Sequence, residues 1–171
     1  MNIMREIRIE KVTLNIGCGK DQTKLDKAVK LLKSITGIDP VKTFAKKRIP
    51  EWGLRPGLPI GCKITLRKKA ASDLLLRLLK AKSFKLMPRH FNDLGNISFG
   101  IEEYIDIPDV KYDPEVGIIG LEACVTLERR GFRIKRRKIC KKKLPKSENI
   151  TTPESVEFMQ KNFNVKMGEE E

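Results

Sequence analysis

The sequence predicts an α+β protein with a mainly antiparallel five-stranded sheet, helices packed on one face, and long basic loops. Four segments alternate apolar and polar residues with the period of two that is typical of half-buried strands, and Pro40 opens a fifth, short strand. Other segments repeat apolar residues at helical spacing. The chain has 171 residues, 40% of them hydrophobic, and it shows neither internal repeats nor an obvious linker. Residues 1–171 should therefore form a single domain, with a frayed acidic end at 168–171.

The first predicted strand, residues 6–16, changes phase along its length. Ile7 and Ile9 share one phase, and the apolar residues from Val12 onward share the other. A phase change of this kind indicates an extra residue in one strand, so we expect a bulge or bend at Glu10–Lys11.

The remaining elements follow in order, with Gly and Thr residues at their boundaries. They are helices over 22–36, 70–82 and 151–163, and strands over 41–46, 59–68, 96–101 and 121–128. Gly37 should end the first of these helices. Thr151 or Thr152 should cap the last helix, and Pro153 fits its first turn. Residues 83–95 and 112–120 are expected to be irregular.

The charge of the chain points to a polyanionic partner. The net charge is +14, which works against compactness unless negative charge is bound. Nucleic acid is the first candidate, and an anionic membrane surface is the second. A membrane binder needs a strongly basic amphipathic helix, whereas the predicted helices are ordinary core-packing ones. No apolar run suits a spanning helix or a signal peptide, so we expect a cytoplasmic protein without a membrane partner.

No group of residues predicts catalysis, a metal site or a cofactor. The sequence GCGK at 17–20 lacks the other residues of a phosphate-binding loop, and its glycines suit a turn. His90 has no nucleophile placed beside it by the sequence. The four cysteines are scattered, and we interpret them as mostly buried thiols with an exposed Cys140. We therefore expect no enzyme, although a basic RNA-processing protein remains the alternative class.

Two predicted strands share a polar face. Lys11, Thr13 and Asn15 lie on one, and the other carries Lys63, Thr65 and Arg67. Cations, hydroxyls and amides suit phosphate oxygens and ribose hydroxyls, and the absence of paired aromatics favours backbone and shape contact over base stacking. An ordinary solvent-facing sheet carries polar residues too, and that alternative stays open.

Residues 129–143 contain ten Lys or Arg and no acid. Such a run is commonly a solvated hairpin or tail, but uncompensated cations repel one another and favour contact with a polyanion. Three interspersed apolar residues, Phe132, Ile134 and Ile139, suggest that part of it is an ordered ribbon. The candidate RNA-contacting residues are Arg129, Arg130, Arg133, Lys135, Arg136, Arg137 and Lys138.

The only tryptophan, Trp52, lies in a Pro- and Gly-rich loop among cations. A stiff basic loop with an aromatic at its centre suits a role in reaching RNA or a partner. The alternative is that Trp52 folds back and covers the base of the loop.

Four stretches together resemble a known family over roughly residues 9–121: IEKVTLNIGCG, LLKSITGIDPVKTFAKKRI, GLRPGLPIGCKITLR and FNDLGNISFGIEEYIDIPDVKYDPEVGIIGL. They resemble the universal large-subunit ribosomal protein five, the 5S rRNA-binding protein of the central protuberance. The tail, with ERRGFRIKRRK and TPESVEFM, resembles the archaeal–eukaryotic branch.

The resemblance implies an α+β sandwich and a structural role in the ribosome. It implies contacts with 5S rRNA, large-subunit rRNA, neighbouring large-subunit proteins, P-site tRNA and a protein of the small-subunit head. Its 5S rRNA contacts, carried onto this chain, would be Lys11, Thr13, Asn15, Thr43, Lys46, Lys47, Lys63 and Arg67. Its tRNA-facing loop corresponds to about residues 47–60, with Arg48, Trp52 and Arg55. A stacking role for Trp52 is our inference and not a family feature.

Overall fold

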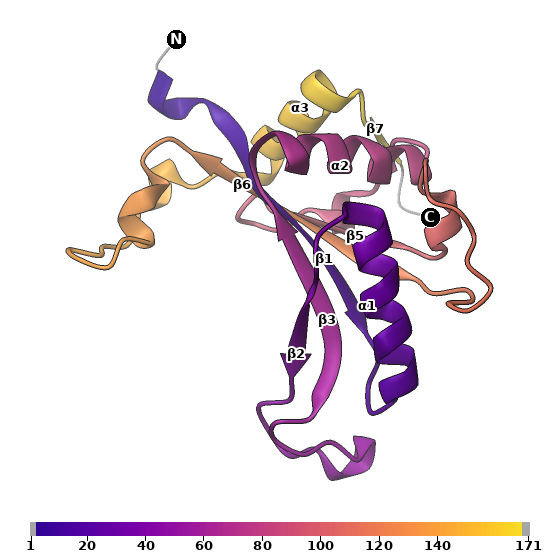
Figure 1. Cartoon of the computed structure of the whole chain (residues 1–171). Helices are drawn as coiled ribbons and strands as arrows, with labels where there is room; N and C mark the ends of the chain where they lie inside the picture. The colour runs from indigo at the N-terminus through magenta and orange to yellow at the C-terminus, as the bar shows by residue number, and fades with distance from the viewer. Residues whose placement is uncertain (1–2, 169–171) are drawn as a thin grey trace.

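The computed structural model describes residues 3–168 and confirms the predicted fold class. Five strands form an antiparallel sheet in the order β2-β3-β1-β6-β5 (Figure 1). Their bounds are β1 Ile7–Gly17, β2 Val41–Phe44, β3 Pro59–Leu66, β5 Ile97–Ile101 and β6 Leu121–Arg129. The predicted fraying at 168–171 falls, except for Gly168, outside the described residues.

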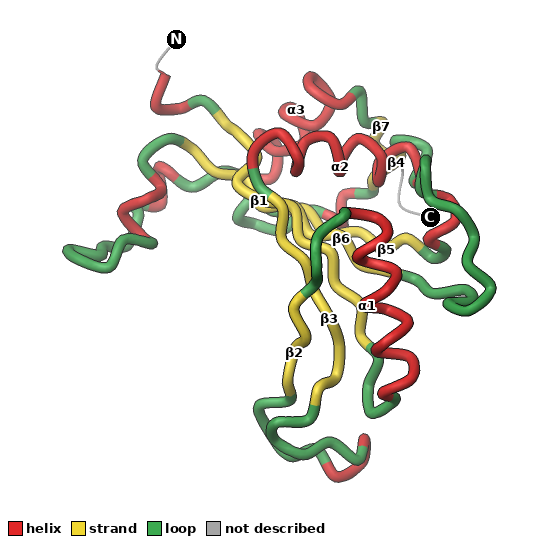
Figure 2. Tube along the Cα trace, in the orientation of Figure 1, coloured by secondary structure: helices red, strands yellow, loops and turns green. Residues whose placement is uncertain are grey.

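Helices α1 (Gln22–Thr36) and α2 (Lys68–Ala81) cover one face of the sheet, and α3 (Thr152–Phe163) lies beside α2 (Figures 1 and 2). The apolar residues of the strands and helices form one buried cluster, in which Leu14, Leu32 and Leu75 are fully buried. Each such leucine stabilises the fold by about 1.5–3 kcal/mol through burial. None of these three helices covers the opposite face of the sheet (Figure 1).

The helix boundaries follow the predicted signals. Gly37 ends α1 in the left-handed conformation, at φ 71°, and its N–H donates to the carbonyl of Lys33. Thr151 and Glu154 form a capping box at the start of α3: the Thr151 side chain accepts from the backbone N–H of Glu154, and the Glu154 carboxylate accepts from the backbone N–H and the hydroxyl of Thr151. This reciprocal capping satisfies donors that the first turn of a helix otherwise leaves unpaired.

The predicted irregularity in β1 is confirmed as a register shift. Arg8 pairs with Glu128 of β6 and Ile9 pairs with Leu127, but the next pair joins Lys11 to Thr126. Glu10 is the extra residue. Because of it, Ile9 and Val12 both contribute to the core, while Glu10 turns toward the uncovered side of the sheet.

The structure contains a small second sheet that was not predicted from the sequence. Strand β4 (Lys85–Leu86) pairs in parallel with β7 (Lys166–Met167), within a stretch predicted to be irregular and at the C-terminal end. Strands of two residues have no measurable alternation, so periodicity cannot reveal them.

The cysteines have the predicted burial, since Cys18 and Cys62 are buried and Cys140 is exposed. Burial raises the pKa of the Cys62 thiol to about 11. His90 stabilises a turn, because its Nδ1 accepts a hydrogen bond from the backbone N–H of Met87. Within residues 3–168, no helix is long and apolar enough to cross a bilayer.

Candidate nucleic-acid interface

The strand register brings the predicted polar residues together on the uncovered side of the sheet, which we call the open face. Thr13 of β1 stands opposite Thr65 of β3, and their hydroxyl oxygens are 3.3 Å apart. Asn15 stands opposite Lys63. Lys11 and Arg67 continue the same alternation, so all six residues share one face.

The open face continues over β6 and β5 with different chemistry. Glu122, Cys124 and Thr126 of β6 stand opposite Asn15, Thr13 and Lys11. Small residues complete it on β5, where Ser98 pairs with Cys124. The cations of the open face therefore gather on β1 and β3, and the β5 side carries small residues only. The β6 and β5 residues were not predicted to lie on this surface, because their position depends on strand order.

At the other edge, β2 brings Thr43 over Gly61 of β3. A Cβ atom on Gly61 would lie 3.1 Å from the Thr43 hydroxyl oxygen and 2.6 Å from the Ile16 carbonyl oxygen. Only glycine allows this close strand packing. Lys46 and Lys47 follow β2 and are exposed, so the predicted residues of this edge extend the cationic side of the open face.

Residues 45–58, which we call the finger, prolong the β2–β3 pair away from the sheet (Figure 1). Backbone hydrogen bonds close it, from Ala45 N–H to the Leu58 carbonyl and in both directions between Ile49 and Leu54. Gly53 turns the tip with φ 65°. The finger is therefore an ordered hairpin.

Trp52 projects from the finger with 67% of its surface exposed. The alternative in which it folds back over the base of the loop is thus wrong, and Leu54 occupies the buried position instead. Arg48 and Arg55 are also exposed. The indole and two guanidinium groups are free to meet a partner.

Residues 129–143, which we call the basic segment, leave the opposite end of the sheet (Figure 1). They form no ribbon beyond Arg129, in contrast to the expectation from the sequence. A short 3-10 helix spans Phe132–Lys135, and Phe132 is buried in the main core. The ammonium of Lys135 lies 5.2 Å from the centre of that ring. The segment is ordered by side chains and turns.

The structure divides the predicted cations of the basic segment into two groups. Arg129 has only 6% of its side chain exposed, and its Nη2 lies 2.5 Å from Glu154 Oε1. Arg130 pairs with Glu6 at 3.3 Å. Arg129 is therefore an internal residue, unlike the exposed surface residue expected from the sequence. The other predicted cations are exposed: Arg130, Arg133, Lys135, Arg136, Arg137 and Lys138.

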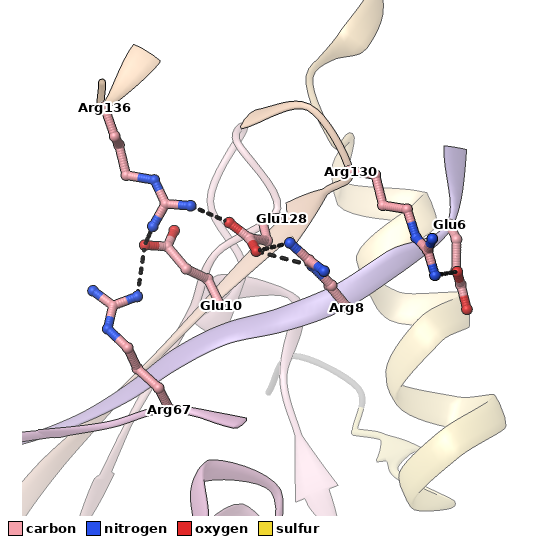
Figure 3. Close-up of polar contacts among 7 residues, drawn as sticks. All are labelled: Glu6, Arg8, Glu10, Arg67, Glu128, Arg130 and Arg136. Atoms are coloured by element: carbon pink, nitrogen blue, oxygen red, sulfur yellow. Dashed lines mark hydrogen bonds and ion pairs between the residues drawn. The ribbon is translucent and has the colours of Figure 1, made fainter. Parts of the chain in front are cut away.

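An ion-pair cluster joins the basic segment to the open face (Figure 3). Its centre is formed by Glu10 and Glu128, whose side chains are each 7% exposed. Around them lie three arginines from separate parts of the chain, namely Arg8, Arg67 and Arg136. The two glutamates and Arg8 were not predicted from the sequence as site residues. The phase change at Glu10 was the one available signal, since a bulged residue departs from the alternation.

Comparison with known proteins gives consistent matches over nearly the whole chain. Residues 2–55 match the family model described as ribosomal protein L5, and residues 59–158 match the model of the C-terminal part of the same ribosomal family. The division falls in the finger, yet β2 and β3 pair across it.

Among similar proteins are three archaeal ones, each named large ribosomal subunit protein uL5. The protein of Nanoarchaeum equitans is 53% identical, over 96% of this chain and 97% of its own length. The protein of Sulfolobus acidocaldarius is 44% identical, over 96% and 92%. The protein of Methanosphaera stadtmanae is 44% identical, over 96% and 98%.

Proposed function

Because this chain belongs to the uL5 family of large ribosomal subunit proteins, we propose that it holds 5S rRNA in the central protuberance with the open face of its sheet. Family membership gives it a structural role in the large subunit, places it in cytoplasmic ribosomes and excludes an enzyme. The confirmed resemblance to the archaeal–eukaryotic branch agrees with the archaeal relatives.

The observation that carries the proposal is the shared orientation of the cations and hydroxyls on β1 and β3. Lysines and arginines neutralise phosphates and release condensed counterions, and the hydroxyl and amide groups between them bond ribose and phosphate oxygens. Because helices α1 and α2 cover the other face of the sheet, an RNA helix would contact only the open face. The contact set comprises Lys11, Thr13, Asn15, Thr43, Lys46, Lys47, Lys63 and Arg67.

The finger would meet the P-site tRNA. Its exposed Trp52 supplies a face for stacking, and Arg48 and Arg55 supply charge for the tRNA backbone. The exposed cations of the basic segment would contact large-subunit rRNA. A protein of the small-subunit head and neighbouring large-subunit proteins complete the proposed partners. We propose no cofactor.

A pair of replacements tests the open face. Lys11 and Lys63 make no ion pair with any residue between 3 and 168, so Lys11→Ala combined with Lys63→Ala removes two proposed phosphate ligands without breaking an ion pair of these residues. The affinity for 5S rRNA should fall at least tenfold, and the slope of log affinity against log salt should lose about two units. Filter binding across a salt series measures both quantities.

The matched control removes the same charge from the helical side. Lys24 and Lys27 are exposed on α1, and their double replacement by Ala should leave the slope unchanged. Equal effects of the two double variants would mean that binding follows net charge, and the open-face model would then fail.

A further inference from the structure

Two carboxylates lie on a surface that we propose to face RNA. Glu10 projects from the bulge of β1, and Glu128 projects from the neighbouring β6. Negative charge repels phosphate, so simple complementarity would exclude glutamate from this position. Both side chains are nevertheless nearly buried, and both are enclosed by arginines.

Arg136 connects the two carboxylates. Its Nη1 donates to Glu10 Oε1 and its Nη2 donates to Glu128 Oε2, each at 2.5 Å. Arg8 approaches the other oxygen of Glu128 with Nε at 2.9 Å and Nη2 at 2.7 Å. Arg67 reaches Glu10 at 3.3 Å. Figure 3 shows the resulting chain of alternating charges.

The arginines keep binding capacity after making these pairs. Their side chains are 56%, 52% and 40% exposed for Arg8, Arg67 and Arg136. A guanidinium has five N–H donors, and none of the three uses more than two of its nitrogens in the cluster. Three cations surround two anions, so the cluster keeps a positive charge and exposed donors of fixed geometry.

We propose that Glu10 and Glu128 are positioning residues that hold Arg8, Arg67 and Arg136 as a ready-made site for the phosphates of an RNA backbone. The same contacts fold the basic segment against the sheet before RNA arrives, because Arg136 lies in the middle of that segment. The identity of the ligand as an RNA phosphate rests on the proposed function. The ordering of the basic segment in the free protein does not depend on that function.

The advantage of such an arrangement is preorganisation. A free arginine loses rotamer freedom when it binds a phosphate, and a loop loses backbone freedom as well. An arginine that a carboxylate already holds has lost most of this freedom on folding. It therefore loses less conformational entropy when it binds RNA. Pairing through two nitrogens also fixes the guanidinium planes of Arg8 and Arg136, which a lysine cannot do.

Replacement of the glutamates separates positioning from bulk charge by the sign of the effect. Glu10→Gln with Glu128→Gln makes the protein more positive, so long-range electrostatics alone predicts tighter RNA binding. Loss of positioning predicts weaker binding. We expect the 5S rRNA affinity of the double variant to fall three- to tenfold.

Hydrogen exchange of the free protein provides a readout without RNA. The amides of residues 133–143 should exchange at least tenfold faster in the double variant than in the wild type. Glu122→Gln is the matched control, since it removes an exposed acid on the same face that forms no ion pair with the described residues. Its exchange should be unchanged, and its affinity should be equal to or higher than that of the wild type.

A second variant keeps the test decisive if the double variant fails to fold. Arg136→Lys retains the charge but loses the bridge between both carboxylates, and it should show the same faster exchange. Arg133→Lys, three residues away, should not, because no side-chain hydrogen bond or ion pair joins Arg133 to another of the residues 3–168. The proposal is overturned if exchange is unchanged in both the double glutamate variant and Arg136→Lys. Tighter RNA binding by the double glutamate variant also overturns it. If the wild type ignores 5S rRNA, the proposed function fails, and exchange alone decides the positioning role.

Discussion

The finger and the basic segment leave opposite ends of the same sheet, and both are rich in cations (Figure 1). Their internal order has different sources. Backbone hydrogen bonds between its two arms hold the finger, and its aromatic residue is exposed. Side chains hold the basic segment, through the buried ring of Phe132 and the ion pairs of Arg136. Two projecting basic regions thus depend on different forces, and perturbations should tell them apart.

The difference also concerns how each region is linked to the core. Phe132 belongs to the main buried cluster of the protein, whereas Leu54, although buried, does not. Loss of Phe132 therefore weakens the whole fold, and loss of Leu54 weakens the finger alone. The comparison predicts global effects at one end of the sheet and local effects at the other.

The largest expected effect is that of Phe132→Ala. Removing a nearly buried ring from the main core should lower the free energy of unfolding by about 3 kcal/mol. It also removes the ring beneath Lys135. Urea unfolding monitored by circular dichroism measures the change. A loss below about 1 kcal/mol would show that the basic segment does not depend on this anchor.

Leu54→Ala should cost about 2–3 kcal/mol, but locally. Amides of the finger, such as those of Ile49 and Gly53, should exchange faster, while the midpoint of global unfolding stays near that of the wild type. Hydrogen exchange with peptide resolution gives both results. A global loss of the same size would place the finger within the cooperative core.

The Glu154 carboxylate caps α3 and pairs with Arg129, the first residue of the basic segment. Its contribution to the stability of the fold should depend on pH. Partial burial acts to raise its pKa, but hydrogen bonds from Thr151 and the charge of Arg129 outweigh it and place the pKa below 4.5. A lowered carboxyl pKa stabilises the fold above the unfolded pKa, and that stability is lost as the pH falls through the folded value.

Glu154→Gln should therefore be less stable than the wild type at pH 7, by at most about 1 kcal/mol because the Glu154 side chain is 40% exposed and water screens its charge, and the difference should shrink as the pH falls below 4.5. Urea titrations at several pH values measure it, and exchange in the finger serves as the internal control. A pH-independent difference would mean that the charge of the carboxylate contributes nothing.

Trp52→Ala should have the smallest effect on folding, within about 0.5 kcal/mol, because the indole is mostly exposed. Positioning of tRNA on the ribosome should nevertheless be impaired, while 5S rRNA binding is unchanged. Thermal melts and tRNA footprinting on reconstituted large subunits test the two halves. A melting temperature lower by several degrees would assign Trp52 to packing.

Local patterns in the sequence predicted the features that are determined within a single strand or loop. Alternation placed Lys63 and Thr65 on the open face, and proline and glycine residues predicted that Trp52 lies in a loop. The Glu10–Glu128 cluster was not predictable, because it requires the pairing of β1 with β6 and the shift at the bulge. The burial of Arg129 was hidden for a similar reason, since its partner Glu154 lies on a helix 25 residues away.

The place of β1 in the sheet has a consequence for biosynthesis. It is the middle strand, yet it precedes all the others in the chain. One neighbour, β3, is complete at Leu66, but β6 begins only at Leu121. A nascent polypeptide that stops between these points exposes unpaired N–H and C=O groups along the centre of an unfinished sheet, which is a template for aggregation. Chains released early should therefore be far less soluble than those that extend past Arg129.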